Sequence, residues 1–181
     1  MVVLGVSSLL VNVTTEAQLS GDAPLALGVR RTASLLLNAG TVWAGVSVLA
    51  GWWALRPARA ALAGVLTGLG ALVVHYGVGE VTGLMPAGSF ADNAPWFVVG
   101  AVTGAPLGLV GSLAHARGRW GLVAASVVPV GAVAEPWVQG WWVAGHGAGW
   151  PTRVSSLVTA VVLTLVGLLG ARRAVRRFRS G

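Results

Sequence analysis

The chain has 181 residues, of which 55% are hydrophobic and only 9% charged, so it carries too little polar material to cover a water-facing surface. Its 12 basic residues are all Arg and outnumber the 5 acidic ones, but they flank apolar runs as membrane-end anchors do, so nucleic acid is not an expected partner. The absence of Cys excludes disulfides, thiolate nucleophiles and Cys-ligated metal centres. We therefore expect a multi-pass protein of the cell membrane that contacts membrane lipid.

The apolar runs, taken in chain order, predict helices long enough to cross a bilayer, which needs roughly 20 residues. The run 2–19 is apolar as far as Val13, lacks the positive start of a signal peptide and is expected to be a helix of the mature protein. The segment 20–37 contains Pro24 and Gly28 and is expected to be a loop followed by an interfacial or re-entrant helical segment. Five further runs meet the length of a span: 38–55, 58–78, 94–115, 120–142 and 152–171.

The arginines predict the orientation, because short cytoplasmic loops are enriched in basic residues. They fall between the second and third spans, between the fourth and fifth, and after the sixth: Arg56, Arg59, Arg117, Arg119, Arg172, Arg173, Arg176, Arg177 and Arg179. Arg30 and Arg31 do not fit this rule. The sequence therefore predicts an all-α fold, a single transmembrane helical bundle over 1–181 with about six spans, five of them clear, and both termini in the cytoplasm.

Glycines at helical spacing are candidates for contacts between the spans, since helices in lipid pack through close approach at small residues. Gly100, Gly104 and Gly108 repeat every four residues on one span, and Gly64 and Gly68 do so on another. The alternative is that glycine is simply abundant, at 27 residues.

Glu135 is the acidic residue expected deepest in the membrane. Ionisable groups at that depth are costly and face a bundle interior or a cavity. Pro136 follows it and cannot donate a backbone hydrogen bond, so we expect a local distortion of the helix. Because low dielectric disfavours a charged carboxyl group, we expect Glu135 to be an available proton donor. The alternative is a protonated side chain that only hydrogen-bonds a neighbouring helix.

A second set of polar residues lies at the end of the third span, in the run from His75 to Glu80. Tyr76 and Glu80 are four residues apart and should share a helix face, which makes both of them catalytic candidates. His75 lies on another side, as a packing residue or as a contact for substrate. Glu16 and Asp92 are expected to face water, and Glu80 at a helix end is open to the same interpretation.

Nine Trp residues divide into two groups under this topology. Trp52, Trp53 and Trp120 lie beside the arginines, as expected of an interfacial belt. The others map to the outer half, near Glu135, where they form either a pocket or a second belt: Trp43, Trp96, Trp137, Trp141, Trp142 and Trp150. Among these, Trp43, Trp96, Trp137 and Trp142, with His75, are the predicted substrate-binding residues.

The motifs that the sequence lacks limit the reactions that the protein could catalyse. The sequence holds no His-Glu-x-x-His zinc motif, no phosphate-binding loop and no Gly-x-Ser-x-Gly nucleophile elbow, so we expect no metal and no cofactor. The remaining parts suit protonation of a lipophilic small molecule. A buried acid supplies the proton, indole faces attract the resulting carbocation, and a dry site prevents its quenching by water.

Ala134-Glu135-Pro136-Trp137, together with Tyr76 and Glu80 in a small, Cys-free, Trp-rich chain, resembles the integral-membrane terpene cyclases of bacterial indole-terpenoid pathways, the drimentine type, and their fungal counterparts. The resemblance implies an intramembrane pocket in which acidic residues initiate cyclisation of a farnesylated or similarly prenylated substrate. Two other classes stay open. A membrane-embedded Glu would serve a small proton-coupled transporter or channel subunit equally well, and the chain could be a non-catalytic assembly partner.

Overall fold

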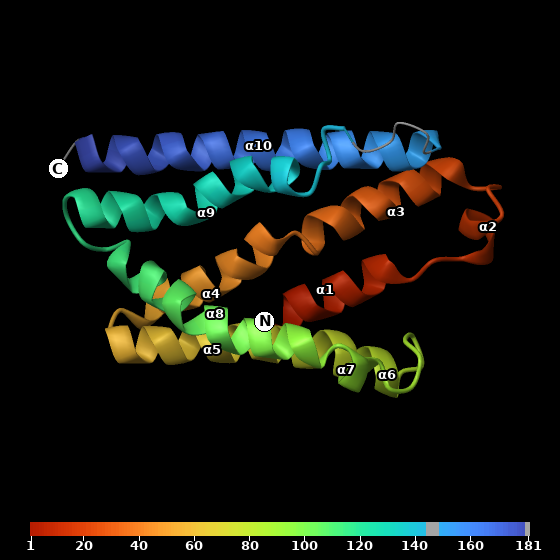
Figure 1. Ribbon diagram of the computed structural model, residues 1–181, viewed down its shortest axis with the longest axis horizontal. Helices are drawn as coiled ribbons and strands as arrows, with labels where there is room; N and C mark the ends of the chain where they lie inside the picture. The colour runs from red at the N-terminus through yellow and green to blue at the C-terminus, as the bar shows by residue number, and fades with distance from the viewer. Residues whose placement is uncertain (144–148, 180–181) are drawn as a thin grey trace.

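The computed structural model describes residues 1–143 and 149–179, and these residues form helices without any strand. This confirms the all-α prediction for the described part of the chain (Figure 1). The elements, in chain order, are α1 (Val2–Asn12), α2 (Glu16–Leu19), α3 (Pro24–Leu37), α4 (Gly40–Ala54), α5 (Pro57–Leu72), the π-helix η1 (Val73–Val78), α6 (Gly79–Val81), α7 (Ser89–Asp92), α8 (Ala94–Leu113), α9 (Arg119–Val138) and α10 (Trp150–Arg179).

Four helices of the described residues are long and apolar enough to cross a membrane, and a bent pair supplies a fifth candidate. The pair is α3 and α4, which meet at 43° across a short break. The segment 20–37, expected to be a loop followed by an interfacial or re-entrant helical segment, is therefore mostly the helix α3. It forms one half of the bent pair, and the other half, α4, was predicted as a whole span. The four continuous candidates are Pro57–Val81, Ala94–Leu113, Arg119–Val138 and Trp150–Phe178.

The expected first span, 2–19, is not a single helix. α1 ends at Asn12, and Val13 has extended backbone angles. A separate short helix starts after Thr15, whose backbone N–H donates to the Gln18 side chain at 3.2 Å. At 11 residues, α1 is roughly 16 Å long, about half the hydrocarbon thickness. Figure 1 accordingly places the N-terminus midway along the bundle rather than at the end where α10 finishes.

Close contacts between glycines hold α4, α5 and α8 together. A Cβ atom on Gly64 would collide with the backbone carbonyl of Gly104, and one on Gly51 would collide with Gly108. Gly108 in turn lies against the carbonyl of Ala60. The predicted stripes are therefore packing surfaces, as expected where helices associate in lipid by backbone approach.

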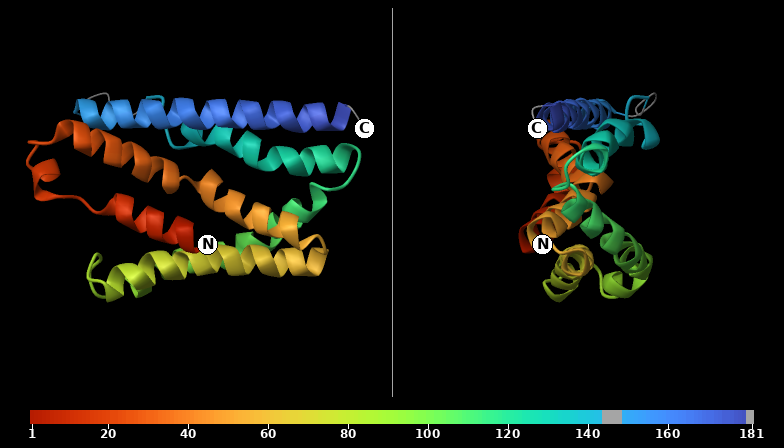
Figure 2. Two further views of the ribbon diagram at one scale, coloured as in Figure 1. Left: turned by 180° about the vertical axis from the view of Figure 1, so that it is seen from behind. Right: turned by 90° about the vertical axis from the view of Figure 1, so that its left-hand side faces the viewer.

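The remaining long helices form the other side of the molecule. α10 packs along α9 and α3, and Figure 2 shows the bent pair α3 and α4 crossing between this side and the side formed by α5 and α8. Ser155 of α10 is fully buried and donates to the carbonyl of Gly28 in α3 at 2.9 Å. The long α10 thus fixes α3, and with it the position of the break before α4.

Charge is separated along the bundle. The α4–α5 turn, the α8–α9 loop and the last turns of α10 lie at one end (Figure 1). We call this the Arg-rich end, defined by Arg56, Arg59, Arg117, Arg119, Arg172, Arg173, Arg176 and Arg177. The connections predicted to share one side of the membrane therefore do lie together. Glu16, Asp22, Glu80 and Asp92 belong to the helices and turns of the opposite end.

Candidate functional site

The break between α3 and α4 is the feature that organises the site. α3 ends with Asn38 as its C-cap, Ala39 has extended angles, and α4 begins at Gly40. Ala39 is buried against Trp141 and against Ala160 of α10. The first backbone N–H groups of a helix have no partner within it, so a helix that starts inside the bundle needs acceptors from elsewhere.

Glu135 supplies those acceptors from α9. Its Oε1 accepts a hydrogen bond from the N–H of Gly40 at 2.6 Å, and its Oε2 accepts one from the N–H of Thr41 at 2.9 Å. The side chain is 9% exposed. Negative charge at a helix N-terminus is favourable, because the partial positive charge of the helix dipole lies there. The residue predicted as the proton donor therefore caps α4, the second half of the bent pair.

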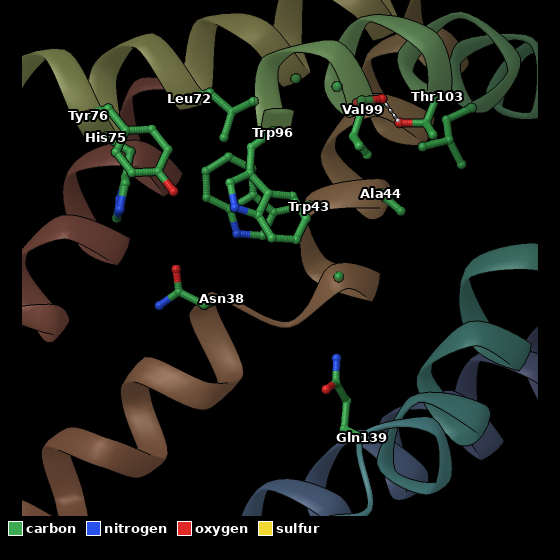
Figure 3. A pocket seen from close by; sticks show the side chains of 15 residues that line it. Asn38, Trp43, Ala44, Leu72, His75, Tyr76, Trp96, Val99, Thr103 and Gln139 are labelled. Atoms are coloured by element: carbon green, nitrogen blue, oxygen red, sulfur yellow. Dashed lines mark hydrogen bonds between the residues drawn. The ribbon is translucent and has the colours of Figure 1, made fainter. Parts of the chain in front are cut away.

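Next to this cap lies a cavity of about 560 Å³, which we call the aromatic cavity (Figure 3). Its wall comes from α4, α5, η1 and α8, with Gln139 just after α9. The lining residues are Asn38, Gly40, Trp43, Ala44, Ser47, Gly68, Leu72, His75, Tyr76, Trp96, Val99, Gly100, Thr103, Leu107 and Gln139. This wall contains no Asp, Glu or Arg, so it is uncharged apart from the titratable imidazole of His75.

The π-helix η1 carries two of the cavity's rings. The rings of His75 and Tyr76 meet edge to face at 4.7 Å, and Trp43 approaches His75 at 6.2 Å. His75 is only 5% exposed, and η1 packs against α1. Wide π-helical turns inside α-helices are frequent at functional sites. Here the turn joins α1 to the cavity wall.

Four of the predicted site residues line the aromatic cavity: Tyr76, His75, Trp43 and Trp96. Figure 3 shows the two indoles and the phenol reaching the same space, with the amides of Asn38 and Gln139 directed toward it. Glu135 is outside this wall and borders it only through Gly40, where a Cβ atom would lie 3.5 Å from Oε1. The predicted convergence of acid and indoles is therefore indirect.

Glu80 lies apart from Tyr76. Its carboxylate accepts hydrogen bonds from the N–H groups of Gly88 and Phe90, at 3.0 and 2.9 Å, and so closes the loop between α6 and α7. It lines a second hollow with Gly77 and Phe90. Tyr76 lines the aromatic cavity and Glu80 the second hollow, so the structure does not bring these two catalytic candidates to one site.

Trp137 and Trp142 also lie outside the aromatic cavity. Their rings are 5.7 Å apart. Trp137 is 70% exposed on the surface of α9, as a lipid-facing indole would be, whereas Trp142 packs beside Ala39 and Trp141. The indoles predicted for the outer half thus divide between the cavity wall, with Trp43 and Trp96, the packed core, with Trp141 and Trp142, and the exposed surface of α9, with Trp137.

Four polar cavity residues were not among the predicted site residues: Asn38, Ser47, Thr103 and Gln139. Asn38 anchors the break, because its Oδ1 accepts from Ser8 at 2.5 Å and its Nδ2 donates to Asn12 at 3.2 Å. Gln139 follows Glu135 by one helical turn. That spacing was a usable signal, since the two polar side chains share a face of an otherwise apolar helix.

Within the described residues, no three His, Asp or Glu side chains are grouped so that they could hold a metal ion. Comparisons with known proteins add no family: no protein-family model, no curated protein and no solved structure matches the chain.

Proposed function

We propose that the protein binds a lipophilic small molecule without net charge in the aromatic cavity, within the membrane. The observation that carries this proposal is the composition of the wall: four aromatic side chains, Trp43, His75, Tyr76 and Trp96, and a few amide and hydroxyl groups, with no carboxylate or guanidinium. Small-molecule sites have this character, with volumes of about 300–1,000 Å³. An ionised ligand would lose its hydration there without gaining an opposite charge.

The ligand class follows from where the polar groups lie. Asn38 and Gln139 present amides on one side, and Trp43 and Leu72 present apolar surface on the other (Figure 3). Such a wall suits a hydrocarbon chain that ends in one or two hydrogen-bonding groups. A prenylated compound, the substrate class predicted from the sequence, has this form.

The bilayer is the natural source of such a ligand. The α8 part of the wall is open, since Trp96 is 57% exposed. Figure 1 shows α8 and α9 close together near the Arg-rich end and diverging toward the other end. Trp96 lies in the first turn of α8, and Gln139 is the C-cap of α9. A lipophilic molecule dissolved in the membrane therefore reaches the cavity sideways, between these helices.

The test is binding of farnesol, an uncharged prenyl alcohol, to the full chain in lipid nanodiscs. Trp43→Ala removes one wall of the cavity and should weaken binding roughly tenfold, as expected for loss of a buried aromatic contact. Trp53→Ala removes an exposed indole at the Arg-rich end and serves as the matched control. Equal affinity in the two variants would contradict the proposal, as would tighter binding of farnesyl diphosphate than of farnesol.

Cyclisation of the bound prenyl chain is the second candidate, as a terpene cyclase would carry it out. Two observations favour it. The indole and phenol faces of the cavity can stabilise a carbocation, and the Glu135 carboxyl group lies just behind Gly40 of the wall. Proton donation by Glu135 requires that one oxygen exchange its hydrogen bond from Gly40 or Thr41 for a proton.

Product analysis distinguishes this reaction from binding alone and from transport. Membranes that contain the protein are supplied with a farnesylated indole, and the extracted lipids are analysed by mass spectrometry and nuclear magnetic resonance. A cyclase yields an isomer of unchanged mass with new rings. Unaltered substrate that accumulates inside vesicles, accompanied by proton flux, identifies the transporter predicted as the alternative.

A further inference from the structure

The Arg-rich end is a surface that the proposed function does not use. Eight exposed arginine side chains come together there from three connections that are distant in the sequence. All five acidic side chains of the protein lie elsewhere: four in the turns and short helices of the opposite end and Glu135 inside the bundle. No carboxylate side chain therefore neutralises this cluster.

The change from apolar to cationic surface is sharp in each element. On α10, the exposed side chains of Leu168 and Leu169 are followed directly by Arg172 and Arg173. At the end of α4, the exposed indole of Trp53 precedes Arg56. Leucine contacts the hydrocarbon core of a bilayer, whereas Trp and Arg collect at its boundary. The arginines thus begin where the headgroup layer begins.

The length of α10 places the boundary of the hydrocarbon core at the same residues. Its 30 residues span roughly 45 Å, about 15 Å more than the hydrocarbon core of a bilayer. The surplus is the last turns of the helix, from Arg172 on. These turns are held in place, because Phe178 packs against Gly121 at the start of α9.

The rest of the surface is held by ring contacts. The imidazole of His115 stacks on Trp52 at 4.6 Å, and its Nε2 lies 2.9 Å from the Trp52 carbonyl oxygen, which ties the end of α8 to the end of α4. The guanidinium of Arg119 lies 5.4 Å from the centre of the Trp120 ring. A ligand therefore meets cations on an ordered surface.

We infer that the Arg-rich end binds the headgroups of anionic phospholipids in preference to zwitterionic ones. A guanidinium donates two parallel hydrogen bonds to a phosphate, and several of them at headgroup depth attract a lipid whose phosphate carries no compensating cation. A zwitterionic headgroup brings its own ammonium group, which the arginines repel. The occupant is thus a lipid such as phosphatidylglycerol.

The test uses the full chain reconstituted in phosphatidylcholine vesicles that contain spin-labelled phosphatidylglycerol or spin-labelled phosphatidylcholine. Electron paramagnetic resonance measures the fraction of each lipid held at the protein surface. We expect phosphatidylglycerol to associate about three- to tenfold more strongly than phosphatidylcholine. The variant R56Q/R59Q/R172Q/R173Q should bring that ratio close to one, with the helical content by circular dichroism unchanged.

Two further arms complete the design. Arg153→Gln removes an exposed arginine near the start of α10, away from the Arg-rich end, and should leave the ratio within the error of the wild type. Glycerol phosphate at millimolar concentration should not displace the labelled lipid. The inference is wrong if the two lipids associate equally with the wild type, if the fourfold variant keeps the preference, or if glycerol phosphate abolishes it.

Discussion

Glu135 and Glu80 perform the same local chemistry in two very different places. Each carboxylate accepts hydrogen bonds from two backbone N–H groups, Glu135 at the start of α4 and Glu80 in the loop before α7. Glu135 is buried between helices, whereas the loop that Glu80 closes is at an exposed end of the bundle. The N–H groups bonded to Glu80 can form hydrogen bonds with water instead, and those bonded to Glu135 cannot.

Burial, more than hydrogen-bond geometry, therefore determines how much each carboxylate contributes to the stability of the fold. An N–H group left without an acceptor costs little in water and much inside a bundle. Replacing Glu135 therefore destabilises the bent pair α3 and α4 and the aromatic cavity beside it, while replacing Glu80 affects one loop.

The largest expected effect is that of Glu135→Gln. The amide keeps one acceptor oxygen, but its NH₂ group cannot accept, so the N–H of Gly40 or Thr41 loses its partner. We expect the free energy of unfolding to fall by about 2–3 kcal/mol, measured by titration with a denaturing detergent. An unchanged stability would show that water reaches the break and would remove the contrast with Glu80.

The expected loss of stability complicates any assay of catalysis with Glu135→Gln. A loss of product in Glu135→Gln has two explanations, a missing proton donor or a collapsed cavity. Binding of farnesol separates them, because a variant that binds normally but forms no product has lost chemistry alone. Glu135→Asp is the useful companion, since it keeps both acceptor oxygens on a shorter side chain.

A smaller effect is expected for Glu80→Gln. The N–H groups of Gly88 and Phe90 exchange their acceptor for water, so detergent unfolding should match the wild type within error. The loop itself should loosen, and amide hydrogen exchange at these two residues should become faster by about tenfold. A global loss of stability as large as that of Glu135→Gln would break the comparison.

A similarly small effect on stability is expected for Gly40→Ala, which adds a methyl group where the Glu135 cap meets the aromatic cavity. Its Cβ would lie 3.5 Å from the Glu135 carboxylate, an ordinary van der Waals contact, so unfolding should change by about 0.5 kcal/mol at most. Because Gly40 also lines the cavity, farnesol affinity should fall modestly, about twofold. A large destabilisation would mean that the cap tolerates no change in spacing.

Several features of the fold followed from local patterns in the sequence. The spacing of Gly64, Gly104 and Gly108 predicted helix contacts because close approach requires small residues at helical intervals. The arginines predicted which connections lie together, since basic residues avoid the hydrocarbon core. These patterns need no knowledge of distant parts of the chain.

The break and the π-helix could not be predicted in this way. The acceptor for Gly40 comes from Glu135, 95 residues later, and no local rule links them. The π-helical turn that carries His75 and Tyr76 has no signature in composition. Trp43 and Trp137 were equivalent in the sequence because an apolar helix shows similar residues to lipid and to the bundle interior.

The cap on α4 also constrains the order of assembly. During translation, Gly40 and Thr41 leave the ribosome long before Glu135 does, since 95 residues separate Gly40 from Glu135. Until α9 inserts, the start of α4 holds exposed N–H groups that hydrocarbon cannot satisfy. We therefore expect the N-terminal half of the protein to stay near the bilayer surface or beside the insertion machinery until α9 has been inserted.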